Sequence, residues 1–111
     1  MKRETIFVEE NNKEYIILIG QNAKDNENII KMSEQNDLWF HVDNLPSAHI
    51  ILQSNGDIIP KRYLNKICSL FRDNSSKLTS RYNIIYTTIK NVKLTRECGK
   101  VITSNTKMIK M

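Results

Sequence analysis

The stretch from residue 37 to residue 52 constrains the fold more than any other part of the chain. Residues 37–43 read DLWFHVD, and this aromatic and β-branched pattern is typical of a β-strand. Residues 44–47 contain asparagine, proline and serine and predict a turn, after which residues 49–52 predict a second, apolar strand. We therefore expect a β-hairpin in which the second strand pairs back on the first.

Side chains alternate between the two faces of a strand, so this hairpin should have two different faces. Leu38, Phe40 and Val42 would form an apolar face, whereas Trp39 and His41 would lie on the opposite face. Strand pairing would then bring the second histidine of the chain near that opposite face. The hairpin is expected to gather the only tryptophan and both histidines of the sequence: Trp39, His41 and His49.

Other apolar runs predict further strands. Residues 5–8 and 15–19 predict a hairpin, and the unbroken run YIILI indicates that its second strand is buried on both faces. Residues 82–89 predict a strand, which a basic connector follows. Residues 100–103 and 107–110 predict a last hairpin that turns at its serine and asparagine.

Two segments have helical patterns. Apolar residues recur at three- and four-residue steps after Pro60, which predicts an amphipathic helix that ends before Asp73. A shorter helix is expected to begin at a cap on Asp25 or Asn26 and to run through Met32. Together the elements predict one α+β domain over residues 1–111: a mostly antiparallel sheet, one long amphipathic helix and one short helix.

The chain has a strongly uneven charge distribution. Residues 1–60 contain five Lys/Arg and ten Asp/Glu, a net charge of −5, whereas residues 61–111 contain twelve and two, a net charge of +10. The second part would bind a polyanion if its cations formed a continuous surface, because clustered cations displace counterions from phosphates. The alternative is an ordinary solvated surface that happens to be basic.

Composition also bears on the compartment. No apolar run approaches the length of a membrane span, and residues 1–15 are charged, unlike a signal peptide. Cys68 and Cys98 are too few to indicate a disulfide framework, so reduced thiols are expected. These features favour a protein of the cytosol or nucleus without a membrane partner, and we expect a cytoplasmic location.

The aromatic and imidazole groups of the hairpin admit two interpretations. Trp39 can stack on a base, and His41 can bind a phosphate or a base edge. Alternatively, Trp39 packs in the core and His41 makes a structural hydrogen bond. The sequence leaves both interpretations open.

The turn after the long helix supplies the best candidates for phosphate contact. Lys77 and Arg81 lie close to Ser75 and Ser76, and a turn between a helix and a strand can present backbone amides and cations together. The alternative is a solvated loop without a ligand.

Catalysis and metal binding have weaker support. His41, Asp43, His49 and a cysteine would be the zinc ligands, but neither cysteine lies in a CxxC pattern. Asp37 and Asp43 lie at the two ends of a strand, which favours separate roles over a catalytic pair. We therefore expect no catalytic residue, no metal and no cofactor, with a small hydrolase or metal enzyme as the third hypothesis.

Several motifs, taken in order, resemble a known family. The first is DLWFH at residues 37–41, followed by a short turn and a second histidine. The others are Gly20 with Asn26-Glu27, Asn74-Ser75 with Lys77, Asn83 to Thr87, Asn91 to Leu94, and Gly99 to Val101. In this order they resemble the NFACT-R domain, the RNA-binding module of the NFACT proteins of ribosome-associated quality control. The likeness is greatest to the short stand-alone eukaryotic members of that family.

The resemblance implies a non-catalytic module that binds rRNA or tRNA on the ribosome, in translation or ribosome quality control. RNA is preferred, and DNA stays open as a ligand. The alternative is a protein-interaction adaptor whose acidic first half binds a ribosomal protein. The residues expected to contact nucleic acid are Trp39, His41, His49, Lys61, Arg62, Lys66, Arg72, Lys77, Arg81, Lys90, Lys93 and Arg96.

Overall fold

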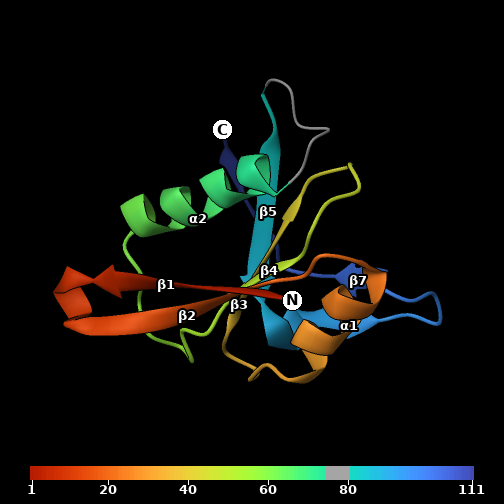
Figure 1. The fold of residues 1–111 in the computed structure, drawn as a ribbon, viewed down its shortest axis with the longest axis horizontal. Coiled ribbons are helices and arrows are strands. Elements are labelled where there is room, and N and C mark those ends of the chain that lie inside the picture. Colours follow the sequence, from red (N-terminus) through yellow and green to blue (C-terminus); the bar gives the residue numbers. More distant parts are fainter. Residues whose placement is uncertain (75–80) are drawn as a thin grey trace.

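A computed structural model describes residues 1–74 and 81–111, and in them a sheet has helices on both sides (Figure 1). The strands are β1 (Lys2–Val8), β2 (Lys13–Ile19), β3 (Leu38–Val42), β4 (Ile50–Leu52), β5 (Asn83–Thr88), β6 (Val92–Leu94), β7 (Val101–Thr103) and β8 (Lys107–Lys110). The helices are α1 (Ala23–Lys31) and the longer α2 (Lys61–Asp73), with the one-turn 3-10 helices η1 (Glu9–Asn11) and η2 (Ile89–Asn91). The predicted α+β class is confirmed.

The main sheet has six strands in the order β1-β2-β4-β3-β5-β8, and every neighbouring pair is antiparallel. Two of the three predicted hairpins, β1–β2 and β3–β4, are confirmed. In the second hairpin, Trp39 lies opposite Ile51 on one side and opposite Thr87 of β5 on the other. β3 is therefore flanked by strands along both edges, and the unusual side chains that it carries lie in the interior of the sheet.

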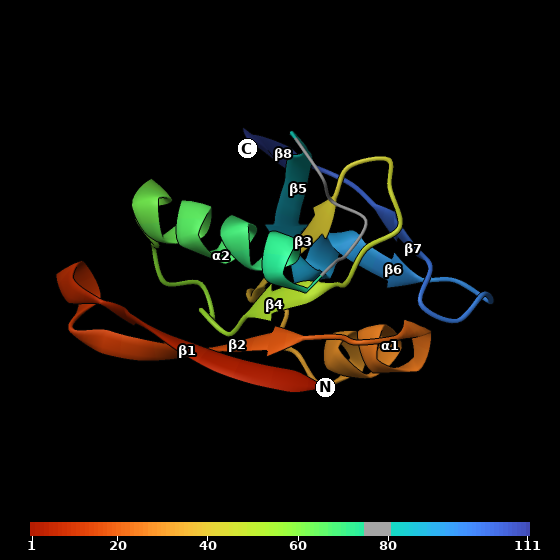
Figure 2. The same ribbon diagram turned by 45° about the horizontal axis from the view of Figure 1, so that its top comes forward.

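Each face of the main sheet has its own apolar core. On one face, Phe40 and Val42 pack with the buried side chains of α2. On the other face, Trp39 packs with Ile29 of α1 and Val92 of β6. Figures 1 and 2 accordingly show α2 and α1 on opposite sides of the sheet. β2 contributes to both cores, which confirms that this strand is buried on both faces.

α2 forms where the apolar stripe predicted it. Pro60 occupies the N-cap position, where its lack of a backbone N–H costs nothing, and the helix begins at Lys61. Neither α1 nor α2 has the length and apolar character that crossing a bilayer requires, and the described residues form no other α-helix. The side chains that α2 buries are Tyr63, Leu64, Ile67, Cys68 and Phe71.

α1 begins earlier than predicted. Its N-cap is Asn22, whose side chain accepts a hydrogen bond from the backbone N–H of Asp25 at 2.8 Å. The Asp25 carboxylate in turn accepts one from the backbone N–H of Gln21 at 3.1 Å. The predicted cap at Asp25 or Asn26 is therefore wrong, because the cap lies at Asn22 and Asp25 is the helical residue whose N–H it binds.

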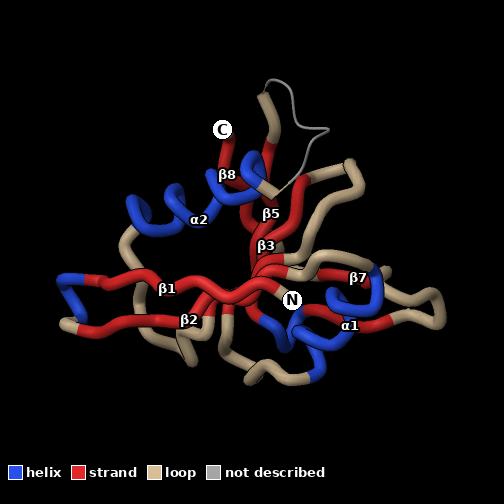
Figure 3. Tube along the Cα trace, in the orientation of Figure 1, coloured by secondary structure: helices blue, strands red, loops and turns tan. Residues whose placement is uncertain are grey.

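The predicted last hairpin is also wrong. β7 pairs with β6 in a separate two-stranded sheet, and β8 pairs with β5 at the edge of the main sheet. The physical reason is burial on two different faces: Ile109 of β8 joins the α2-side core, whereas Val101 of β7 packs against the α1-side core. The ribbon formed by β6, β7 and their connecting turn (residues 92–103) thus lies beside α1 (Figure 3).

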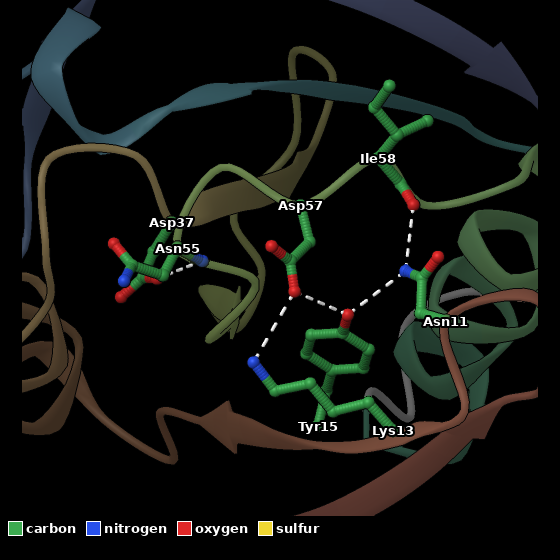
Figure 4. A network of polar contacts seen from close by, with 7 residues as sticks. All are labelled: Asn11, Lys13, Tyr15, Asp37, Asn55, Asp57 and Ile58. Carbon is green, nitrogen blue, oxygen red and sulfur yellow. Dashed lines mark hydrogen bonds and ion pairs between the residues drawn. The ribbon is translucent and has the colours of Figure 1, made fainter.

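A polar network anchors the loop between β4 and α2 to the first hairpin (Figure 4). The Tyr15 hydroxyl donates to Asp57 at 2.6 Å, and Asn11 donates both to that hydroxyl and to the Ile58 carbonyl at 3.0 Å. Asp37 accepts hydrogen bonds from the backbone N–H groups of Glu34 and Asn55, at 2.9 Å each. The first residue of the DLWFH run therefore joins two loops at the end of β3 opposite to the histidines.

Candidate functional site

An open cleft of about 840 Å³ lies on the α1 side of the sheet, where segments distant in sequence meet. It is lined by Trp39 and His41 of β3, by residues 44–49 of the β3–β4 loop, by the start of α1, and by residues 98–101 and Thr103 of the ribbon. The cleft is the place where the hairpin presents its polar side chains.

The tryptophan and the two histidines form one compact cluster in this cleft, as the hairpin predicted. The Trp39 indole N–H donates to Nδ1 of His49 at 3.1 Å. The His41 ring stacks on Trp39 with centroids 5.7 Å apart, and it meets His49 edge-on with centroids 4.9 Å apart. Trp39 is only 2% exposed and His49 3%, whereas His41 is half-buried. Trp39 is thus a buried support of the cleft, and His41 is the more accessible ring.

Burial keeps both imidazoles neutral. Desolvation, with a smaller contribution from the proximity of His41, lowers the pKa of His49 to about 3. Desolvation also lowers the pKa of His41, against the opposing effects of the Val42 carbonyl and of Asp43. The cleft therefore offers neutral hydrogen-bonding groups near pH 7.

A side-chain brace from α1 fixes the backbone of His49. The Asn26 side-chain oxygen accepts a hydrogen bond from the His49 backbone N–H at 3.1 Å, and the Gly20 N–H donates to the His49 carbonyl at 2.9 Å. A Cβ atom on Gly20 would overlap the Asn26 side-chain oxygen. Glycine is therefore required at residue 20 by a close approach that positions the histidine.

A second close contact fixes the ribbon against α1. Gly99 has a φ of +79°, a left-handed conformation that favours glycine, and a Cβ on it would lie 2.9 Å from the Cα of Ala23. The turn closes through a hydrogen bond from the Thr95 N–H to the Lys100 carbonyl at 3.1 Å. The ribbon wall of the cleft is therefore held directly on the first turn of α1.

The predicted cations are divided between the two faces of the sheet. All four cations of α2 are exposed, and Arg62 is paired with Glu10 at 2.6 Å. α2 packs on the face of the sheet opposite to α1, but Asn74 at its C-terminal end lines the cleft and Arg72 stacks on Tyr82, next to Arg81. The cations of η2, β6 and the turn after β6 belong to the cleft side and are exposed: Lys90, Lys93 and Arg96. One member of the expected basic surface, Arg62, thus neutralises a carboxylate of the acidic first half.

Of the two best phosphate candidates, only one lies in the part of the chain that the structure describes. Lys77 lies outside the described residues, as do Ser75 and Ser76. Arg81 is exposed just before β5, and the Asp43 N–H donates to the Asn83 carbonyl at 2.8 Å. Arg81 therefore lies near the end of β3 from which the cleft-lining loop departs.

Comparison with known proteins now decides the family. The model of the family described as NFACT protein RNA binding domain matches residues 4–111. The chain belongs to the NFACT RNA-binding domain family. It is 34% identical over 105 residues to a coiled-coil domain-containing protein 25 homolog of Dictyostelium discoideum, covering 87% of this chain and 51% of that protein. It is 36% identical to the protein of Danio rerio named coiled-coil domain-containing protein 25, covering 75% and 43%.

Two further likenesses cover less sequence or only the fold. The Rqc2 homolog RqcH of Streptococcus suis is 37% identical over 43 residues, covering 38% of this chain and 8% of that protein. The solved C-terminal part of the fibronectin/fibrinogen-binding protein from Streptococcus suis has a TM-score of 0.80 and 22% identity, covering 99% of this chain and 45% of that one. The chain spans about half the length of the curated coiled-coil relatives it matches.

Some residues of the NFACT-R cleft were not assigned a role from the sequence. The sequence indicated Asn26 only as a possible helix cap and part of a family motif, and Gly20 only as part of that motif, yet both brace His49. The signal for Asn26 was available, because it stands three residues before Ile29 and so shares the buried side of α1. Lys100 also lines the cleft and pairs with Glu97 at 3.1 Å, but its position became evident only from the ribbon.

Other chemistry of the NFACT-R chain lies elsewhere or is dispersed. Asp37 and Asp43 lie at opposite ends of β3. Burial raises the pKa of the Cys68 thiol to about 12, which makes it a poor nucleophile. In the part of the chain that the structure describes, no three His, Cys, Asp or Glu side chains converge as metal ligands would.

Proposed function

We propose that this chain is a non-catalytic RNA-binding module that docks on ribosomal or transfer RNA in translation or ribosome quality control. Its membership of the NFACT RNA-binding domain family supports RNA as the ligand. The likeness to the Rqc2 homologs supports the quality-control context. On this proposal residues 1–111 act as one domain, in the cytoplasm.

The observation that carries the proposal is the cleft. It combines neutral imidazoles, amide and hydroxyl side chains and backbone amides, and no aspartate or glutamate lines it among the described residues. A surface that approaches a sugar-phosphate chain must avoid carboxylates, because like charges repel at short range. The described lining of the cleft meets this requirement, although Glu97 pairs with Lys100 at its rim, just as Glu10 pairs with Arg62 beside α2.

Cations next to the cleft would bind the phosphate groups of the RNA backbone. Arg81 precedes β5, and Arg96 and Lys100 belong to the turn of the ribbon. Each phosphate contact contributes mainly through counterion release, so binding should weaken as salt rises. We therefore assign the RNA-facing surface to the α1 side of the sheet, with α2 on the far side.

Paired charge reversals test this assignment. The first variant carries Arg81→Glu and Arg96→Glu on the cleft side, and the matched variant carries Lys61→Glu and Lys66→Glu on α2. Affinity for ribosomal RNA and tRNA would be measured by fluorescence anisotropy over a salt series. The cleft-side variant should bind more weakly, with a logarithmic salt slope lower by about 0.7 per lost contact.

The two variants have the same charge change, so a general electrostatic effect would weaken both equally. A loss confined to the α2 variant would move the interface to the other face. Unchanged affinity in both would refute phosphate contact by these residues. Sedimentation of a cell extract with and without RNase would then show whether the protein travels with ribosomes.

A further inference from the structure

Both histidines of the cleft have a ring nitrogen without a hydrogen-bond partner among the described residues. Only 3% of His49 is exposed, and its Nδ1 accepts a hydrogen bond from the Trp39 indole. Its other ring nitrogen, Nε2, makes no hydrogen bond to the described part of the chain, and His49 lines the cleft. A polar ring atom that faces a cleft without a protein partner is expected to meet a ligand or water.

The hydrogen bonds also fix which nitrogen carries the proton. An indole N–H can only donate, so Nδ1 of His49 must accept, and the proton of the neutral ring lies on Nε2. Nδ1 of His41 lies 2.6 Å from the Val42 carbonyl, which can only accept, so that nitrogen is protonated and Nε2 of His41 is bare. The pair thus presents one neutral donor and one neutral acceptor.

The rest of the cleft favours a flat, uncharged group. Its side chains include the apolar Leu45, Pro46, Ile85 and Val101, and the one charged side chain among the described lining residues is Lys100. A phosphate buried there would meet too few cations to replace its hydration. A heteroaromatic base has apolar faces and an edge with both donors and acceptors, and the volume of about 840 Å³ exceeds what one base requires.

We propose that the cleft receives one unstacked base of the bound RNA, which accepts a hydrogen bond from Nε2 of His49 and donates one to Nε2 of His41. This inference rests on the proposed function and specifies what part of the RNA the cleft takes. Unpaired RNA bases are available for such insertion, because loops and bulges present them unstacked. The cations outside the cleft then hold the flanking phosphates.

Trp39 provides the measurement, since it is the only tryptophan and lines the cleft. A short single-stranded RNA would be titrated against the full chain while Trp39 emission and RNA anisotropy are recorded together. The same RNA with one abasic site, moved stepwise along it, would follow. We expect emission to change with intact RNA, and one abasic position to abolish that change and weaken binding about tenfold.

Protein variants provide the second part of this experiment. His41→Ala should reproduce the tenfold loss and remove the dependence on the abasic site. Phe7→Ala is the control, because it removes an exposed ring from β1, outside the cleft. Ribose 5-phosphate and inorganic phosphate should leave Trp39 emission unchanged. Adenosine and cytidine monophosphates, which carry a base, should change it.

The outcomes separate this inference from the proposed function. If RNA binds with salt-dependent affinity but every abasic RNA binds equally well, base insertion is refuted and RNA binding stands. If ribose 5-phosphate alters Trp39 emission as the mononucleotides do, the cleft takes phosphate and the inference is wrong. If no RNA binds, both proposals fail.

Discussion

The two faces of the sheet differ in how completely they are covered. α2 closes one face over an apolar core in which Phe40, Ile67 and Phe71 are fully buried. The other face is covered by α1 and the ribbon, which leave an open cleft between them. Buried polar side chains also belong to this second face, including Asn26 and His49.

The difference shows how one strand serves two purposes. Even-numbered residues of β3 supply the closed core, and odd-numbered ones supply the cleft. Polar groups are tolerated beneath the cleft because they satisfy one another: Trp39 with His49, and His49 with Asn26. One face therefore stabilises the fold, and the other can be specialised for a ligand.

The largest effect should come from the closed face. Phe40→Ala removes a fully buried ring that stacks on Tyr86, and it should lower the free energy of unfolding by about 3–5 kcal/mol. Urea unfolding followed by circular dichroism measures this. A loss below about 1 kcal/mol would contradict the view that this face carries most of the stability.

Close packing beneath the cleft should give the next largest effect. Gly20→Ala displaces the Asn26 side chain and strands the His49 N–H, so we expect a loss of about 2–4 kcal/mol. In the Asn26→Ala background the added methyl group meets no side-chain oxygen, so Gly20→Ala should cost much less there. Additive losses in the double variant would show that the two residues do not interact.

Acidification should weaken the cleft face selectively. The pKa of His49 is about 3 in the folded chain against an ordinary 6.5, so below pH 6.5 the unfolded chain binds the proton that the folded chain excludes. Stability should therefore fall as pH drops from 6.5 towards 3, with a slope approaching about 1.4 kcal/mol per unit. Proton NMR of the His49 ring should show no titration above about pH 5. A midpoint near 6.5 would contradict this.

The indole hydrogen bond should have a smaller effect. Trp39→Phe keeps an aromatic ring but leaves Nδ1 of His49 without its donor, which should cost about 1–2 kcal/mol. Chemical denaturation gives the value, and Tyr86→Phe serves as a control in which a ring hydroxyl outside the cleft is lost. Equal stability of the Trp39 variant and the wild type would show that the bond contributes nothing.

The smallest effect should come from the exposed ion pair that links the first hairpin to α2. Glu10→Gln removes the charge opposite Arg62 but leaves Tyr63 able to donate to residue 10. Solvent screens such pairs, so the thermal midpoint of unfolding should change less than in any variant above. The difference in midpoint between this variant and the wild type should disappear in high salt. A large, salt-independent shift would overturn this ranking.

Local sequence patterns were sufficient to predict the α2 face of the sheet and part of the cleft face. The α2 stripe, both hairpins and the convergence of Trp39, His41 and His49 follow from periodicity within short segments. The β6–β7 pairing did not, because residues 92–94 are too short for a strand pattern and their partners lie seven or more residues away. The Asn26–His49 bond joins residues 23 apart, so no local rule predicts it.

The alternation along β3 has a consequence for how this chain can change in length. A one-residue insertion within residues 38–42 would turn the indole towards α2 and a phenyl ring towards the open side. Single substitutions in that strand can be tolerated, whereas a shift in register would place the wrong side chains on both faces of the sheet at once. We therefore expect insertions and deletions to be tolerated in the β3–β4 loop and rejected in the five residues before it.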